Sequence, residues 1–273
     1  MKIITPSGEG LLLLGLSFVT AMITKPAVGG NMPQLPGKQE LKWTVTVKKH
    51  FVFHTLEKDP MSEGDFAFHE NVLQQSCRKL EIALPKFVTH YYKYPDNKTK
   101  GCITKDYGNG IACLSGPPDD KDTVPEIHTI YARDNHELIH ILMLQYGIPL
   151  PLLSEGIAVF MSGSWQKRPI AQYNLEILNS KKYIPLEKII DSKEFYKNEL
   201  ISYSEAAGFT GFITIKWGVE KFKELYKSSA QLSNQKTVSH AFKNLFSKIY
   251  RIEFEKAEKE WLKKISNEDS RQK

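Results

Sequence analysis

Two histidines and a glutamate share the segment DNHELIH at residues 134–140. His136 and His140 are four residues apart, so on a helix they lie one turn apart on the same face, where two imidazoles can bind one zinc ion. Glu137 lies about 100° around such a helix from His136, and its carboxylate can reach water on the metal without binding the metal itself. The H-E-x-x-H pattern therefore predicts a zinc site with two histidine ligands and Glu137 as general base.

A third ligand is expected in the segment LLSEGIAVF at residues 152–160, where Glu155 is the only charged residue of an apolar helical stretch. An ionised carboxylate is costly in a protein interior unless something neutralises it. One zinc ion would do so, and His136, His140 and Glu155 would form a His₂Glu set with the fourth position open for water. Gly156 would allow another helix to approach closely.

A second interpretation of the first segment needs no metal. Asp134 is a suitable N-cap and Glu137 follows three residues later, which is the capping-box pattern, so the histidines would be ordinary helix residues. By chance, H-E-x-x-H would occur in on the order of one chain in a hundred of this composition. The carboxylate of Glu155 in its apolar segment favours the metal site over this interpretation.

The two segments together resemble the peptidase MA-like group of gluzincins, in which H-E-L-x-H is followed closely by P-x-x-x-E-G-x-A. Residues 136–140 and 151–158 match these motifs, and looser similarity at residues 203–209 and around Trp261 extends the resemblance over roughly residues 50–265. Leu153 departs from the family pattern, since an aromatic residue is common there, but it is not a metal ligand. The resemblance implies a zinc metallopeptidase that acts on a peptide or protein substrate, with Glu137 passing a proton from water to the leaving amine.

Further residues are expected near this site. Tyr203 is a candidate oxyanion donor, because related metallopeptidases often supply one from a later helix, although an ordinary core tyrosine is the alternative. The β-prone run at residues 127–131 resembles the family's edge strand, to which an extended peptide would add antiparallel. Its His128 is interpreted as a sheet residue and not a ligand. Asp134 or Glu205 is expected to accept the second ring N–H of a ligand histidine. The other histidines have no motif spacing and are expected to be structural: His50, His54, His69, His90 and His240.

The elements that would position these residues can be predicted from periodicity. Strands are favoured by the alternation at residues 41–47, the apolar residues 51–53, and residues 87–94 and 127–132. One helix is favoured at residues 65–84. Beyond residue 135 the pattern is helical at 136–147, 151–161, 170–178, 185–191, 204–217, 218–229, 238–247 and 252–265. We therefore expect an α+β fold: one catalytic domain (40–266) with a sheet lobe (40–134) containing a small mixed sheet and one helix, a mostly helical lobe (135–266), and the zinc helix at the junction.

Composition supports a globular protein. Of 273 residues, 41% are hydrophobic, which is enough for a sizeable core. The 37 Lys and Arg against 31 Asp and Glu give a net charge of +6, but the positive charges are spread among carboxylates. The short basic clusters lack the interleaved aromatic residues of a single-strand-binding groove, so we expect no nucleic-acid partner.

The N-terminal region has the pattern of an export signal: Lys2, an apolar run at residues 11–23 and small residues at 27–30. We expect residues 1–29 to be a signal peptide, because the run is shorter than the ~20 residues that span a bilayer comfortably. An uncleaved membrane anchor is the alternative. The protein is then periplasmic, on the cell surface or extracellular. In such a compartment Cys102 and Cys113, which flank a turn-rich segment, would form a disulfide-closed hairpin, or all three cysteines would be reduced.

Two functions are compatible with these observations. The first is an active zinc endopeptidase or aminopeptidase. The second is a zinc-stabilised binding or envelope protein with little or no turnover. Glu137 favours the enzyme, since a structural zinc site needs no base and usually closes its fourth position with a protein ligand. A non-peptide amide or ester substrate is chemically allowed as well.

Overall fold

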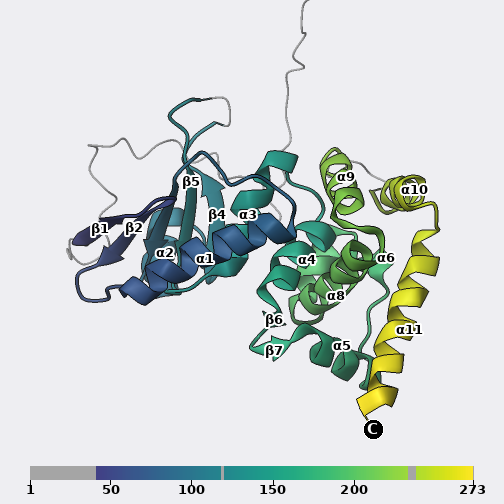
Figure 1. Cartoon of the computed structure of the whole chain (residues 1–273). Coiled ribbons are helices and arrows are strands. Elements are labelled where there is room, and N and C mark those ends of the chain that lie inside the picture. Colours follow the sequence, from purple (N-terminus) through teal and green to yellow (C-terminus); the bar gives the residue numbers. More distant parts are fainter. Residues whose placement is uncertain (1–40, 118–119, 233–237, 273) are drawn as a thin grey trace, which may run out of the picture.

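The computed structural model of the chain describes residues 41–117, 120–232 and 238–272. Its N-terminal part contains a five-stranded mixed sheet, and the part after residue 134 is mostly helical (Figure 1). The predicted α+β class is therefore confirmed. The predicted signal peptide or anchor at residues 1–29 lies outside the described residues. Within the described ranges, each helix is too short or too polar to span a bilayer.

The strands are Trp43–Val47 (β1), Phe51–Leu56 (β2), Thr89–Lys93 (β3), Gly110–Leu114 (β4) and Pro125–Thr129 (β5), arranged in the order β1-β2-β3-β5-β4. The inner pairs β2–β3 and β3–β5 are parallel, whereas the outer pairs β1–β2 and β5–β4 are antiparallel. Side chains alternate between the two faces of each strand. Phe51, Phe53 and Tyr91 all point to one face and are fully buried there.

Helix α1 (Glu63–Lys79) packs on that buried face of the sheet (Figure 1). It begins with a capping box between Ser62 and Asp65, and it buries Phe66 and Leu73. The rings of Phe53 and Phe66 are 4.6 Å apart. The predicted helix after the first two strands is therefore present, although it ends before the predicted boundary.

The prediction of one helix in the sheet lobe was wrong, because a second helix, α2 (Asn97–Thr104), follows β3. Asp96 caps it by accepting the backbone N–H of Thr99 at 2.7 Å. The ring of Tyr107 lies over Gly101, where an added Cβ atom would be 2.3 Å from the ring. The helix has a weak apolar pattern, and it is held by its cap and by this close packing, neither of which periodicity reveals.

The helical part consists of α3 (Asn135–Met143), a short 3₁₀ helix η1 (Leu144–Tyr146), α4 (Pro151–Ser162), α5 (Ile170–Asn179), α6 (Leu186–Ile189), α7 (Ser192–Lys197), α8 (Glu199–Trp217), α9 (Val219–Ser229), α10 (Val238–Tyr250) and α11 (Phe254–Gln272). A two-stranded hairpin, β6 (Ser164–Trp165) and β7 (Arg168–Pro169), separates α4 from α5. Helix α7 was not predicted. One cluster of buried apolar side chains includes residues from both parts, among them Phe51 of β2 and Phe254 of α11.

Helix α3 lies where the two parts meet. It follows β5 after five residues, and it contacts α1, β4 and β5 on the side of the sheet and α4 on the helical side. This agrees with the expected position of the H-E-x-x-H helix at the junction. Residues from the sheet edge and from the helical part can therefore meet around it.

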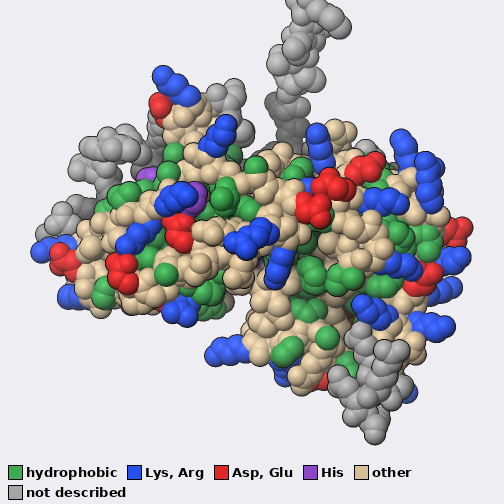
Figure 2. Space-filling view, in the orientation of Figure 1, with side chains coloured by type: hydrophobic (Ala, Val, Ile, Leu, Met, Phe, Trp, Pro, Cys, Tyr) green, Lys and Arg blue, Asp and Glu red, His purple; other side chains and the backbone are tan. Residues whose placement is uncertain are grey.

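The charged side chains are scattered over the face of the molecule shown in Figure 2. Lys and Arg side chains lie over both parts, and Asp and Glu side chains lie among them. Several pair across elements, as Lys243 does with Glu187 and Glu255. On this face the positive charge is dispersed and is not collected into one patch.

Candidate metal centre

The first turn of α3 fixes the direction of its side chains. Asp134 caps the helix by accepting the backbone N–H of Glu137 at 3.3 Å, and it also accepts the hydroxyl of Thr129 on β5 at 2.7 Å. The capping role foreseen for Asp134 in the metal-free interpretation is therefore real. It does not leave the histidines as ordinary helix residues, because His136 and His140 converge on a buried carboxylate.

That carboxylate is Glu155, on a helix that begins with Pro151 at a favourable N-terminal position. Glu155 is only 1% exposed. The expectation for Gly156 is confirmed: an added Cβ atom would lie 2.4 Å from Oγ1 of Thr210 and 2.8 Å from the carbonyl oxygen of Ala206, both on α8. The absent side chain lets α4 approach α8 closely and holds Glu155 against α3.

The three ligand atoms form a nearly equilateral triangle. Nε2 of His136 and Nε2 of His140 are 3.1 Å apart, and Oε2 of Glu155 lies 3.2 Å from the first and 3.4 Å from the second. Tetrahedral coordination with bonds of about 2.0–2.1 Å separates ligand atoms by about 3.3 Å. His136, His140 and Glu155 thus form a group that can hold a metal ion.

The charges of this triangle are strongly coupled. Burial alone would raise the pKa of Glu155, but the charge of His140 and hydrogen bonds from both histidines outweigh burial and hold that pKa well below its usual range. Burial would likewise lower the pKa of His136, yet its hydrogen bond to Glu155 and the nearby carboxylates raise that pKa to about 9. The triangle therefore attracts positive charge, which a metal ion would supply.

Glu137 stands beside the triangle and takes no part in it. Glu137 is 7% exposed as a residue, and its buried Oε2 has no hydrogen-bond partner among the described residues. Burial raises the pKa of Glu137 to about 7, although the positive charge of His136 opposes this effect. A buried carboxylate with one unsatisfied oxygen next to a metal-ligand set fits the presence of a polar group, such as water, in the adjoining space.

Aromatic side chains form one wall of the site. The ring of Tyr203 on α8 lies 6.4 Å from that of His136, and Trp165 of β6 stacks on Tyr203 at 4.3 Å. Tyr196 on α7 was not predicted, and its hydroxyl donates to Oε1 of Glu155 at 3.5 Å. The contact could not be foreseen, because α7 itself has too few residues to show a period.

Glu205 does not support a ligand histidine. It accepts the backbone N–H of Ile184 at 2.9 Å, and its Oε2 has no partner within the part of the chain that the structure describes. Burial, together with the nearby charge of Glu258, raises its pKa to about 9. Asp134 was the other residue considered for holding a ligand histidine. The contacts of its carboxylate described above are with the backbone of α3 and with Thr129, so it joins α3 to β5.

The predicted edge strand was assigned to the wrong residues. The run at 127–131 overlaps β5, which lies between β3 and β4 and is already paired on both sides. The edge is β4, and its Gly110 lies directly against Glu137. β4 begins in the turn-rich segment between Cys102 and Cys113, and those turn residues obscured its short alternating pattern.

The predicted hairpin closed by a Cys102–Cys113 disulfide is also absent. Cys102 lies on α2 and Cys113 on β4, and both are free, as is the buried Cys77. The alternative of three reduced cysteines agrees with the structure. Helix α2 occupies the place of the expected hairpin arm and carries Cys102 on a separate element.

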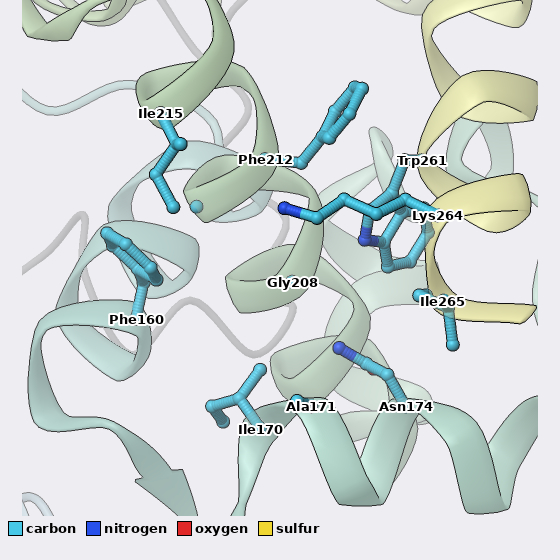
Figure 3. A pocket seen from close by; sticks show the side chains of 11 residues that line it. Phe160, Ile170, Ala171, Asn174, Gly208, Phe212, Ile215, Trp261, Lys264 and Ile265 are labelled. Atoms are coloured by element: carbon cyan, nitrogen blue, oxygen red, sulfur yellow. The ribbon is translucent and has the colours of Figure 1, made fainter. Parts of the chain in front are cut away.

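A pocket of about 210 Å³ lies elsewhere, between α4, α5, α8 and α11 (Figure 3). Its lining is mostly apolar; Asn174 is buried, and the extended side chain of Lys264 reaches across the middle of the pocket in Figure 3. Gly208 leaves room for Asn174 and Trp261, since an added Cβ atom would be 2.1 Å from Nδ2 of Asn174. The lining contains none of the three residues that form the metal-ligand triangle.

No protein-family model matches this chain. None of the curated proteins shows significant sequence similarity to it. The function proposed below rests on the geometry of the triangle and of the groups around it.

Proposed function

We propose that this protein is a zinc metallopeptidase of the gluzincin type, with His136, His140 and Glu155 as ligands of one zinc ion. The observation that carries the proposal is the triangle of two imidazole nitrogens and one carboxylate oxygen, 3.1–3.4 Å apart, beside Glu137, whose Oε2 has no partner among the described residues. Nitrogen and oxygen ligands in a three-residue set are typical of catalytic zinc. When bound, zinc would lower the pKa of a coordinated water and polarise a substrate carbonyl.

Glu137 would act as the general base. A base works best when its pKa is close to the working pH, because it then accepts a proton in one step and releases it in the next. Burial gives Glu137 a pKa of about 7. Glu137 would take a proton from the attacking water and pass it to the leaving amine nitrogen as the peptide bond breaks.

The edge strand β4 would align the substrate. Its pairing with β5 leaves its other edge available within the described sheet, and it begins at Gly110, beside Glu137. An extended peptide that adds to such an edge uses its own backbone hydrogen bonds, so it would bind with limited dependence on side chains. This placement favours peptide or protein substrates over small amides and esters.

Two tyrosines are candidates for stabilising the negative charge that develops on the carbonyl oxygen. Tyr203 remains the first candidate, because its ring faces that of His136. Tyr196 contacts Glu155 and would position this ligand instead. An export signal at residues 1–29 would place the enzyme outside the cytoplasm, in agreement with the proposed substrates.

The test is metal content and peptide hydrolysis measured on the same purified samples. The wild type and Glu137→Gln should each hold one zinc ion in this site, whereas His140→Ala and Glu155→Ala should lose it. Only the wild type should cleave a mixed peptide library. Zinc binding by the wild type without cleavage would favour the alternative of a zinc-stabilised binding protein. No loss of zinc in either ligand variant would overturn the site itself.

A further inference from the structure

The face of the sheet that points away from α1 carries an unusual set of polar side chains. Because side chains alternate along a strand, His90 of β3, Glu126 of β5 and Cys113 of β4 lie on this face as register partners in one row. His128 lies two residues beyond Glu126 on the same face. In sequence these residues have no common motif spacing, and strand pairing alone brings them together.

Three of these side chains converge. The ligand atoms of Cys113, Glu126 and His128 all lie within 4.8 Å of one another. Nε2 of His128 is 3.0 Å from Oε2 of Glu126, and the two side chains are 10% and 17% exposed. An ion pair of His128 with Glu126 would account for these two residues, but it gives no role to the thiol beside them.

We propose that Cys113, Glu126 and His128 form a second metal site, separate from the triangle on α3 and α4. A thiolate, an imidazole and a carboxylate together suit a borderline transition metal ion such as Zn²⁺, and not Mg²⁺ or Ca²⁺, which prefer oxygen ligands only. A tetrahedral zinc ion would place its sulfur and nitrogen ligands about 3.5 Å apart, so small side-chain rotations suffice. His90 lies opposite Glu126 in the register, but it is outside this convergent group and its Nδ1 lies 3.1 Å from Nε2 of His54, so the fourth position of the ion would be open to solvent.

The surroundings of His128 support this role. Nδ1 of His128 lies 2.8 Å from the hydroxyl of Tyr94, while Nε2 faces Glu126. A histidine ligand usually has its second ring nitrogen held by a hydrogen bond, which fixes the ring and frees the other nitrogen for the metal. The ring of Tyr92 stacks on His128 at 4.6 Å and limits its rotation. His128 is thus held with one nitrogen directed at the cluster.

The site would also serve the fold. Within the described sheet β4 pairs only with β5, so the edge strand has hydrogen-bond partners on one side. A metal ion held by Cys113 on β4 and by Glu126 and His128 on β5 would tie the two strands together through their side chains. Metal binding should therefore raise the melting temperature even when the first site is disabled.

Cobalt(II) distinguishes the two sites, because only the second contains sulfur. A thiolate bound to cobalt gives an intense charge-transfer absorption band in the near ultraviolet, which nitrogen and oxygen ligands do not give. The metal-free full-length chain, kept reduced, should develop this band on addition of cobalt, and zinc should abolish it. The double variant His136→Ala/His140→Ala should retain the band, so a failure of the proposed peptidase site leaves this test unaffected.

Cys113→Ser should abolish the band, and the matched control Cys102→Ser should keep it. Bound cobalt should fall by one ion per chain in Cys113→Ser, whether or not the first site is occupied. Glu126→Gln removes one ligand and should weaken the cobalt affinity, measured from the absorption band, about tenfold or more. Circular dichroism checks that this variant is folded. The proposal is overturned if the wild type shows no band, or if the band survives in Cys113→Ser.

Discussion

Oε1 of Glu137 lies 2.7 Å from the point that a Cβ atom on Gly110 would occupy. No side chain fits between the edge strand and the proposed base, so the backbone of β4 runs directly past the carboxyl. Oδ2 of Asp134 is nearly as close to this point, at 2.9 Å. A glycine at this position thus allows the sheet edge, the helix cap and the proposed base to meet.

Gly110→Ala should therefore impair catalysis without removing the metal. The added methyl group would push Glu137 away from its position, and a misplaced general base should lower kcat by about 10²-fold. Zinc content should remain that of the wild type. Gly64→Ala on α1 is the matched control, since its Cβ atom would make only ordinary contacts at 3.6 Å or more. Unchanged kcat in Gly110→Ala would argue against Glu137 as the base.

Gly156→Ala should destabilise the protein. The new Cβ atom would collide with Thr210 and with the backbone of Ala206, so α4 and α8 would have to separate. Overpacking of this kind costs about 1–3 kcal/mol in the free energy of unfolding. Denaturation in urea measures the change, and a weaker zinc affinity should accompany it because Glu155 moves with α4. A loss below the error of the urea experiment would mean that the two helices adjust easily.

The two tyrosines should give separable effects. Tyr203→Phe should lower kcat by about 10²-fold with zinc retained, which is the usual loss when one oxyanion donor is removed. Tyr196→Phe should instead weaken zinc binding about tenfold, because the hydroxyl that contacts Glu155 is lost. Steady-state kinetics and zinc titration distinguish these outcomes. If Tyr203→Phe changes only the melting temperature, Tyr203 is a core residue.

Glu205 should make stability dependent on pH. Its pKa is about 9 in the folded protein and 4.5 in the reference state, so between these values the unfolded chain releases a proton that the folded chain keeps. The contribution of Glu205 to the free energy of unfolding is therefore largest below pH 4.5 and is lost as the pH rises toward 9. Glu205→Gln removes this contribution.

The stability of Glu205→Gln relative to the wild type should accordingly increase with pH from about 5 to 9. Thermal melts of both proteins across this range measure the difference. Comparison at each pH cancels the other titrating groups, which the two proteins share. A constant difference over the whole range would show that Glu205 is ionised in the folded state.

Sequence periodicity predicted much of this fold because most elements have a strong apolar pattern. The alternation at residues 41–47 and the apolar 51–53 yielded β1 and β2, and the long helices after residue 135 were found with modest boundary shifts. Elements held by single local contacts escaped detection. Helix α2 depends on the cap at Asp96, and α7 on the cap at Asp191, which accepts two backbone N–H groups.

The candidate site was predictable to the extent that local spacing determines it. His136 and His140 belong to one helix, and the carboxylate of Glu155 is conspicuous in an apolar segment, so their meeting could be foreseen. The edge position of β4 depends on strand order, which pairs segments far apart in the chain. For the same reason the convergence of Cys113 with Glu126 and His128 is visible only in three dimensions.

The close crossing of α4 and α8 at Gly156 has a consequence for how metal would enter and leave. Glu155 is held by the packing of α4 against α8, and α3 is held by Asp134 and the sheet, so this packing would position the proposed ligands without a metal ion. A preorganised site loses little conformational freedom on binding, in contrast to small zinc domains that are unfolded without their metal. The metal-free protein should therefore remain folded. Removal of the metal by a chelator should be reversible and should leave the fold unchanged.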